Sequence, residues 1–384
     1  MFEKVLTAFV AIVVQMAFAA DPTITNVSAQ QRYPWNGKVD ISYKVTGDIA
    51  AVAKERVLEA SLKVTATDKV ANKTYTATQL SGDKALTAGT HSLVWDLDAE
   101  GLSFKSSNVV FKVSCETAPG TYCVIDMSAG SNASSYPVTY LASPPSGGFN
   151  VDAYKKTKLV LRRLEAGSYT GGFYNKQITL TKPFFCGLFE VTQKQYSLVM
   201  GSNPSNFSGD TLPVETVSYN DIRGSSNGTN WPASSAVDVS SFMGKLRART
   251  GLDFDLPTSA QWEYACRAGT TTTYYWGDSM NGNYAWYRDN SSSAPHAVGL
   301  KTANAWGLYD MSGNVGEWCL DWQGSGSETY GTDPVGVSSG MYRVMHGGDW
   351  DDPAGYCTSA RAASVAPSFK SDSYGFRIVR TLSN

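Results

Sequence analysis

GLYDMSGNVGEW, residues 307–318, is the stretch that says most about the fold of this 384-residue chain. It contains three glycines and one asparagine, and most of its large apolar residues are separated from one another by small or polar ones. This composition predicts an ordered loop with brief strands. The sequence around it has the same character, and eight of the ten tryptophans lie at or after Trp231. With 12% aromatic and only 17% charged residues, the chain is typical of a large, loop-rich, well-packed globular protein.

Three short helices are expected to interrupt this loop-rich region. Thr192–Gln195 has the pattern of a capping box and predicts a helix that ends near Met200. A second helix is expected over 234–249, and a third begins after Thr258 and ends at Gly269. Residues 151–384 are therefore expected to form a single α+β unit with little regular structure.

The first part of the chain, residues 21–115, is expected to be all-β. Lys38–Val45 alternates apolar and polar residues, which is typical of a half-buried strand. Further short strands are predicted within 61–79, 91–97 and 109–113. Short strands over about 95 residues fit an immunoglobulin- or fibronectin-like β-sandwich.

Two segments differ in composition from these domains. Residues 1–20 combine Lys4, an apolar run and the small-x-small pattern Ala17–Ala19, which is typical of a signal peptide. Residues 116–150 accumulate Ser, Pro and Gly, and we interpret them as a linker that packs onto the domain after it. The protein is therefore expected to be exported to the periplasm, the cell surface or the medium.

The remaining composition excludes several kinds of partner. A net charge of −2 argues against nucleic-acid binding, and no apolar run after the signal peptide is long enough for a transmembrane segment. Disulfides persist in an exported protein. Cys115 and Cys123 are close enough in sequence to close a small loop, although the connectivity of the six cysteines stays open.

Motifs after residue 158 follow one another in an order that resembles a known family. The chain is similar to the formylglycine-generating enzyme, or sulfatase-modifying factor, family over about residues 158–380. The residues that carry the resemblance are Phe189–Gln193, Asn203–Ser205, Leu212–Glu215, Leu256–Thr258, Gln261–Thr270, Gly307–Val315, Glu317, Trp318, Gly347, Gly348, Cys357, Arg361 and Gly375–Arg377. The resemblance implies a variant of the C-type lectin fold.

The resemblance also implies a chemistry, and the sequence departs from it. Active members oxidise a sulfatase cysteine to formylglycine with oxygen and a copper(I) ion held by two cysteine thiolates. Cys357 falls on the second of these cysteines, whereas the first is Asp352. A carboxylate is a hard ligand and replaces a thiolate poorly for copper(I). Three further family positions have changed, at Asp349, Gly316 and Ser373.

The same resemblance implies a calcium site that this sequence retains. Its ligands would be the side chains of Asp310 and Glu317 and the carbonyls of Gly313 and Val315. Two carboxylates with backbone carbonyls are typical calcium ligands. The alternative is that the two carboxylates only hydrogen-bond amides of the loop.

The acidic residues beside the cysteine positions are candidates for ligand binding. Asp349, Asp351 and Asp352 surround Trp350 and are expected to bind a cation or the hydroxyls of a sugar, with the Trp350 ring as a stacking face. The alternative is a solvated acidic loop. Further candidates for contact with a ligand within and beyond the 349–374 loop are Arg361, Ser373 and Arg377. Cys357 is either a free thiol or half of a disulfide, for which Cys266 is one candidate partner.

A second motif, Gly336–Gly340, matches the G-x-S-x-G nucleophile elbow. That elbow needs a strand before it, a helix after it and a histidine partner. The run lies between turn residues, and His346 is too close in sequence to be an obvious partner, so a simple turn is favoured.

Two hypotheses about function remain. The first is an exported, catalytically degenerate protein that binds a protein or carbohydrate ligand and is stabilised by calcium. The second is a divergent oxidase that uses copper and Cys357 to convert a sulfatase cysteine to formylglycine. The hypotheses differ in whether residue 352 can support copper chemistry.

Overall fold

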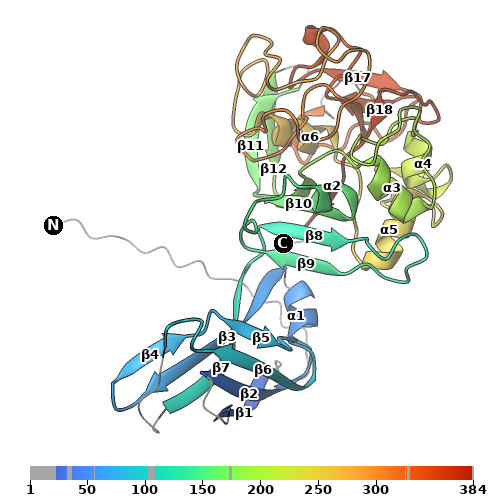
Figure 1. The fold of residues 1–384 in the computed structure, drawn as a ribbon. Helices are drawn as coiled ribbons and strands as arrows, with labels where there is room; N and C mark the ends of the chain where they lie inside the picture. Colours follow the sequence, from blue (N-terminus) through green and yellow to red (C-terminus); the bar gives the residue numbers. More distant parts are fainter. Residues whose placement is uncertain are drawn as a thin grey trace. The chain divides into compact units, whose positions relative to one another are not determined.

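A computed structural model describes residues 23–32, 37–55, 57–102, 109–172, 175–324, 326 and 329–382 of the chain. The chain divides into two compact units, with the boundary between Ala118 and Pro119, and each unit is described separately (Figure 1). The expected signal peptide, residues 1–20, lies outside the described residues. No helix among the described residues has both the length and the apolar character that a membrane span requires.

The first unit is a β-sandwich, as predicted. One sheet has the strand order β1-β2-β6-β5 and the other β4-β3-β7. Their bounds are Thr23–Gln31 (β1), Lys38–Thr46 (β2), Leu58–Asp68 (β3), Lys73–Thr76 (β4), Leu80–Gly82 (β5), Gly89–Asp96 (β6) and Val109–Pro119 (β7), with helix α1 at Ile49–Glu55 between β2 and β3.

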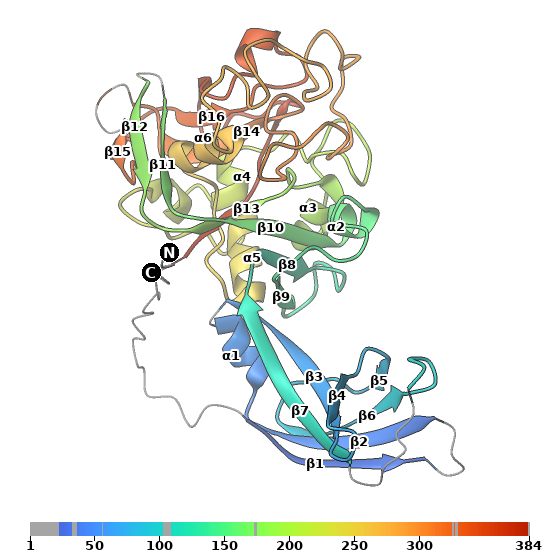
Figure 2. The same ribbon diagram turned by 90° about the vertical axis from the view of Figure 1, so that its left-hand side faces the viewer.

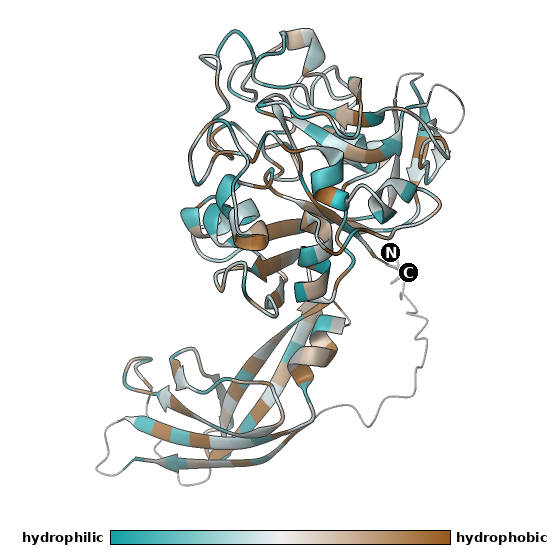
Figure 3. Ribbon diagram, turned by 90° about the vertical axis from the view of Figure 1, so that its right-hand side faces the viewer, coloured by the Kyte–Doolittle hydropathy of each residue, from teal (hydrophilic) through white to brown (hydrophobic). Residues whose placement is uncertain are grey.

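Alternation along the strands builds the core of this sandwich. The strands change between hydrophobic and hydrophilic residues along their length (Figure 3). Val39, Ile41 and Tyr43 of β2 are buried, and they share one cluster with Val64 and Ala66 of the opposite sheet. Period-2 burial on both sheets therefore confirms the strand prediction from the sequence.

The second unit combines short sheets, small helices and much ordered loop. Its sheets have the orders β19-β13-β10-β8-β9, β11-β12-β15 and β17-β16-β14-β18. The strands are Tyr122–Asp126 (β8), Val138–Leu141 (β9), Lys158–Leu164 (β10), Gly167–Gly171 (β11), Lys176–Leu180 (β12), Phe184–Gly187 (β13), Gly316–Trp322 (β14), Gly331–Thr332 (β15), Arg343–His346 (β16), Ala362–Val365 (β17), Tyr374–Gly375 (β18) and Val379–Thr381 (β19).

The structure corrects the prediction of a linker over residues 116–150. Strands β8 and β9 lie in this stretch, and β8 pairs antiparallel with β10 through five register positions from Lys158↔Asp126 onward. Residues 119–150 therefore belong to the second unit, whose main sheet includes β8 and β9, whereas residues 116–118 lie in β7 of the first unit. The Ser, Pro and Gly residues that suggested a linker lie in the turns around these strands rather than in a spacer.

Capping residues set the helix boundaries of the second unit. Thr192 and Thr258 each form a complete capping box, at the starts of α3 and α6, as their sequence patterns predict. The helix expected over 234–249 is shorter, because Ser241 caps it and only Phe242–Thr250 is helical. The helices are Asp152–Lys156 (α2), Gln193–Met200 (α3), Tyr219–Arg223 (α4), Phe242–Thr250 (α5) and Ser259–Arg267 (α6), with 3-10 turns at Asn227–Asn230 (η1) and Ala354–Tyr356 (η3).

Helix α6 anchors the core of the second unit, where it packs against β14 and β16 (Figure 2). Trp262, Ala265 and Cys266 lie fully buried on its inner face. Among the described residues, which include all six cysteines, no disulfide is formed. The pairings considered for Cys115 with Cys123, and for Cys357 with Cys266, are therefore absent.

Candidate functional site

The loop that follows β16 gathers the residues at the family's cysteine positions. Asp349 and Asp352 fold onto each other, because the Asp349 N–H donates to Asp352 Oδ2 at 3.2 Å and the Asp352 N–H donates to the Asp349 carbonyl at 3.1 Å. The Asp351 N–H donates to Asp349 Oδ1 at 2.8 Å. Arg288, which the sequence did not single out, holds this loop by donating to the carbonyls of Asp351 (2.7 Å) and Asp352 (3.0 Å).

The pKa values of the Asp349 and Asp352 carboxyl groups are raised, so both groups ionise at higher pH than an ordinary aspartate. Burial, and then the charge of Asp352, raise the pKa of Asp349 to about 6, although a hydrogen bond from Ser373 opposes the rise. Burial also raises the pKa of Asp352. Perturbed carboxyl groups that lie close together cost stability and are typical of functional sites.

This shift predicts how stability depends on pH. The folded protein binds the Asp349 proton more tightly than the unfolded chain, whose Asp pKa is 3.8, so stability falls as pH rises from about 4 through about 6. Asp349→Asn is therefore expected to raise the melting temperature at pH 7.5 and to change it little at pH 4. Calorimetry at both pH values tests this expectation. An equal change at both would show that the charge of Asp349 does not carry the effect.

Trp350 does not offer the expected stacking face. Only 9% of the residue is exposed, and its ring packs edge-on against Phe207 with ring centroids 5.7 Å apart. The indole N–H donates to the Asp372 carbonyl at 3.1 Å. The prediction of ligand stacking on this ring is wrong, because the ring is buried. Trp350 instead holds the loop against Phe207 and Asp372.

Cys357 is a buried free thiol next to the two aspartates. A Cβ atom added to Gly348 would lie 2.9 Å from its sulfur, so the thiol packs against glycine backbone. Burial, then the negative charges of Asp352 and Asp349, raise the pKa of the thiol. A protonated thiol beside a hard carboxylate does not fit a copper(I) thiolate site.

The other predicted contact residues divide between the surface and the core. Arg361 is exposed, and its guanidinium lies 4.7 Å from the centre of the Tyr356 ring. Ser373 is buried, and its hydroxyl is 3.1 Å from that of Ser371. Arg377 is wholly buried. The prediction that Arg377 contacts a ligand is therefore wrong.

Arg377 instead neutralises Glu317 in the core. Its Nε donates to Glu317 Oε2 and its Nη2 donates to Oε1, both at 2.6 Å. Trp262 Nε1 also donates to Oε2, at 2.7 Å. Both Arg377 and Glu317 are inaccessible to solvent, so each depends on the other for compensation.

Two more buried carboxylates lie near this ion pair. Asp310 accepts the Gly299 N–H at 2.6 Å, and burial raises the pKa of its carboxyl group to about 6. Burial, and then Asp310, raise the pKa of Glu190 well above its usual range. Glu190 accepts bonds from Asn314 Nδ2 (2.6 Å) and the Val315 N–H (3.2 Å), within the loop where calcium is expected.

The loop that joins Asp310 to Glu317 is tightly wound. Gly313 has φ +74°, and a Cβ atom there would lie 1.9 Å from the Trp286 carbonyl oxygen, so only glycine fits. Asp310 and Asn314 also have positive φ, at 55° and 65°. Across the described residues, no three Cys, His, Asp or Glu side chains converge as metal ligands. Any ion here would depend on carbonyl oxygens as well as carboxylates.

Comparison with known proteins identifies the family. The family model described as "Sulfatase-modifying factor enzyme 1-like domain" matches residues 145–382, more than half of the chain. The chain belongs to this family. The sulfatase-modifying factor domain thus includes the loop of Asp349, Asp352 and Cys357 and the carboxylate cluster around Glu317.

Individual relatives support this assignment. "Chaperone protein LppX" of Paenibacillus barcinonensis is 29% identical over 262 residues, which cover 57% of this chain and 88% of that protein. "Formylglycine-generating enzyme" of Streptomyces coelicolor is 35% identical over 144 residues, which cover 32% of this chain but only 45% of the enzyme. The solved structure of "Treponema denticola variable protein 1" has a TM-score of 0.50 and 27% identity, and covers 59% of this chain and 96% of that one.

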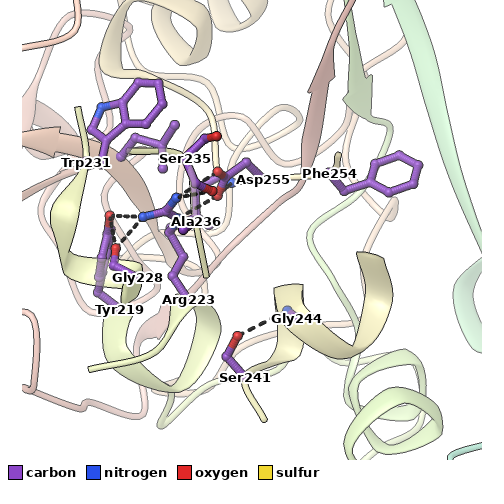
Figure 4. A network of polar contacts seen from close by, with 12 residues as sticks. Tyr219, Arg223, Gly228, Trp231, Ser235, Ala236, Ser241, Gly244, Phe254 and Asp255 are labelled. Atoms are coloured by element: carbon purple, nitrogen blue, oxygen red, sulfur yellow. Dashed lines mark hydrogen bonds and ion pairs between the residues drawn. The ribbon is translucent and has the colours of Figure 1, made fainter. Parts of the chain in front are cut away.

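Arg223, Arg247 and Asp255 form a second polar network in the family domain, and no sequence motif predicts it. Arg223 is fully buried, and it donates from Nε to Asp255 Oδ1 (2.7 Å) and from Nη2 to Oδ2 (2.9 Å), while Nη1 donates to the Tyr219 hydroxyl (3.1 Å) (Figure 4). Arg247 adds a bond to Asp255 Oδ2 at 2.7 Å. Asp255 lines a cavity of about 320 Å³ together with Trp231.

Proposed function

We propose that this chain is an exported protein whose sulfatase-modifying factor domain binds a ligand and has lost formylglycine generation. The observation that carries the proposal is the environment of Cys357, which is a buried thiol with a raised pKa and Asp352 as its neighbour. Copper(I) would need two soft thiolates at this place. Export rests on the sequence of residues 1–20.

The ligand would be a protein or a carbohydrate that offers hydrogen-bond donors to the acidic loop. Asp349 and Asp352 supply carboxyl oxygens, and Arg361 supplies an exposed cation on the segment that follows. Hydroxyl and amide donors form strong bonds with such carboxylates. Trp350 contributes by fixing the loop rather than by touching the ligand.

A copper(I) titration against a chromophoric chelator, under reducing conditions, tests the lost chemistry. The unaltered protein is expected not to compete with the chelator for copper(I). The variant Asp352→Cys is expected to remove about one copper ion per chain from the chelator. The variant is a matched control, because it restores only the missing soft ligand. Tight binding of one copper ion by the unaltered protein would contradict the proposal.

We further propose that Asp310, Glu317 and the carbonyls of Gly313 and Val315 hold calcium. Arg377 already binds both oxygens of Glu317, so the buried carboxylates of Glu190 and Asp310 are left with the buried Lys155 near Asp310. Burial is the main cause of the raised pKa of Asp310, and the charge of Glu317 adds to it. A divalent cation would stabilise the ionised form of such a buried carboxylate.

Calcium is therefore expected to stabilise the second unit. At a hundred times the dissociation constant, binding adds about 2.7 kcal/mol, or roughly 5–10 °C in melting temperature for a unit of this size. Calorimetry with calcium and with excess chelator measures the difference, and Asp310→Asn is expected to abolish it. Equal melting temperatures with calcium and with chelator would exclude the site.

A further inference from the structure

A cavity of about 510 Å³ in the second unit contains a serine and a histidine in direct contact. Ser259 Oγ lies 2.7 Å from His346 Nε2, and both residues line the cavity. Ser259 is the first residue of α6, and His346 is the last residue of β16. The serine is partly exposed, whereas the histidine is buried behind it.

The direction of the hydrogen bond between them follows from the other ring nitrogen. His346 Nδ1 lies 2.9 Å from the Arg361 carbonyl oxygen, which can only accept, so Nδ1 carries the proton. In the neutral ring Nε2 is then an acceptor, and the Ser259 hydroxyl donates to it. Burial lowers the pKa of His346 to about 4, which keeps the ring neutral near pH 7.

The ring is also held in place. Trp262 stacks on His346, with ring centroids 4.8 Å apart and an angle of 7° between the planes. Trp262 is itself fixed by its bond to Glu317. A serine that donates to an oriented, neutral imidazole is the arrangement of a nucleophile and its general base.

The start of helix α6 supplies a donor for a developing negative charge. In its first turn the Ser259 N–H donates to Asp321 (2.8 Å) and the Gln261 N–H donates to the Thr258 hydroxyl (3.1 Å). The Ala260 N–H, which follows the serine, finds no acceptor among the described residues, and Ala260 lines the cavity. An N–H directly after a nucleophilic serine is a recurring oxyanion donor.

The cavity wall indicates the class of substrate. Ile178, Val344 and Ala363 supply apolar surface. Arg361 lines the cavity together with Glu263 and Asp321, and Glu263 is paired with Arg267, so the lining has no strong excess of one charge. The volume lies within the range of small-molecule sites. An uncharged carboxylic ester with an apolar acyl group matches this lining.

We propose that Ser259 and His346 form an acyl-transfer site for uncharged carboxylic esters. The Ser259 oxygen bonds to the ester carbonyl carbon as His346 Nε2 takes the hydroxyl proton, and the carbonyl oxygen becomes an oxyanion at the Ala260 N–H. When this tetrahedral intermediate collapses, the bond between the carbonyl carbon and the alcohol oxygen breaks, and the alcohol leaves with the proton from Nε2. Water then attacks the acyl-serine, gives its proton to Nε2 and releases the acid, while the proton returns to Ser259.

This site does not depend on the proposed function. Asp349, Asp352 and Cys357 do not line this cavity, and Arg361, which the proposed ligand site also includes, has no part in the acyl transfer beyond its carbonyl bond to His346. A base with a low pKa abstracts protons weakly, so acylation is expected to be slow and to be followed best as a covalent adduct.

Labelling of the full chain with an alkyl fluorophosphonate tests the proposal. Intact mass spectrometry is expected to show one adduct per chain, and peptide mapping is expected to place it on Ser259. His346→Gln is expected to slow the labelling at least about 100-fold. Ser259→Ala is expected to abolish it, and Ser364→Ala, at another serine of the same cavity, is expected to leave it unchanged.

Two results would overturn the proposal. One is the absence of any adduct on the unaltered chain under conditions that label a control serine esterase. The other is an adduct that maps to a residue other than Ser259. Both readouts use the unaltered protein, so the result stands even if Ser259→Ala or His346→Gln fails to fold.

Discussion

Replacement of Arg377 by methionine is expected to lower the free energy of unfolding of the second unit by about 3–5 kcal/mol. The guanidinium is fully buried and holds both oxygens of Glu317 at 2.6 Å. Without it, Glu317 keeps the Trp262 N–H as its one side-chain partner among the residues that the structure describes. Urea unfolding followed by tryptophan fluorescence measures the loss, because eight of the ten tryptophans lie in this unit.

Two controls separate the ion pair from the general effect of losing an arginine. Arg361→Met removes an exposed guanidinium and is expected to change stability by less than about 0.5 kcal/mol. The double variant Arg377→Met with Glu317→Gln is expected to be less destabilised than the sum of the single changes, because it leaves no uncompensated charge. Strict additivity would contradict this account of the pair.

Asp255→Ala is expected to have an effect of similar size, about 3–5 kcal/mol. Asp255 is the carboxylate partner of Arg223, which is fully buried (Figure 4). It also pairs with Arg247. Its removal leaves the Arg223 guanidinium with the Tyr219 hydroxyl and backbone carbonyls. Urea unfolding of the second unit measures the change.

Asp253 offers a matched control for this substitution. It lies two residues away and lines the same cavity of about 320 Å³, but it is exposed. Asp253→Ala is therefore expected to change stability by less than about 0.5 kcal/mol. Equal losses from the two alanine substitutions would show that burial of Arg223 does not govern the effect.

The elements that local patterns determine were predictable. The capping boxes at Thr192 and Thr258 place α3 and α6, because their hydrogen bonds involve residues three positions apart. Alternation places β2 in the same way. The strands within 116–150 were missed, because the pairing of β8 with β10 depends on a sheet partner and not on local composition.

The sequence predicted which residues lie near the candidate site, but it did not predict whether each of them contacts a ligand or stabilises the fold. The order of the family motifs predicts that Asp352 and Cys357 lie in one loop. In the structure they are close enough for the charge of Asp352 to raise the pKa of the Cys357 thiol. Burial of Trp350 and Arg377 depends on distant neighbours, so their structural roles were not visible in the sequence. Ser259 and His346 are 87 positions apart, and no local spacing connects them.

Oxygen consumption with a sulfatase-type CxPxR peptide and one equivalent of copper(I) tests the central claim most directly. We expect no oxygen uptake above that of copper with peptide alone, and an unmodified cysteine in the peptide by mass spectrometry. Copper-dependent uptake, with conversion of that cysteine to formylglycine and loss of both in Cys357→Ser, would contradict the account.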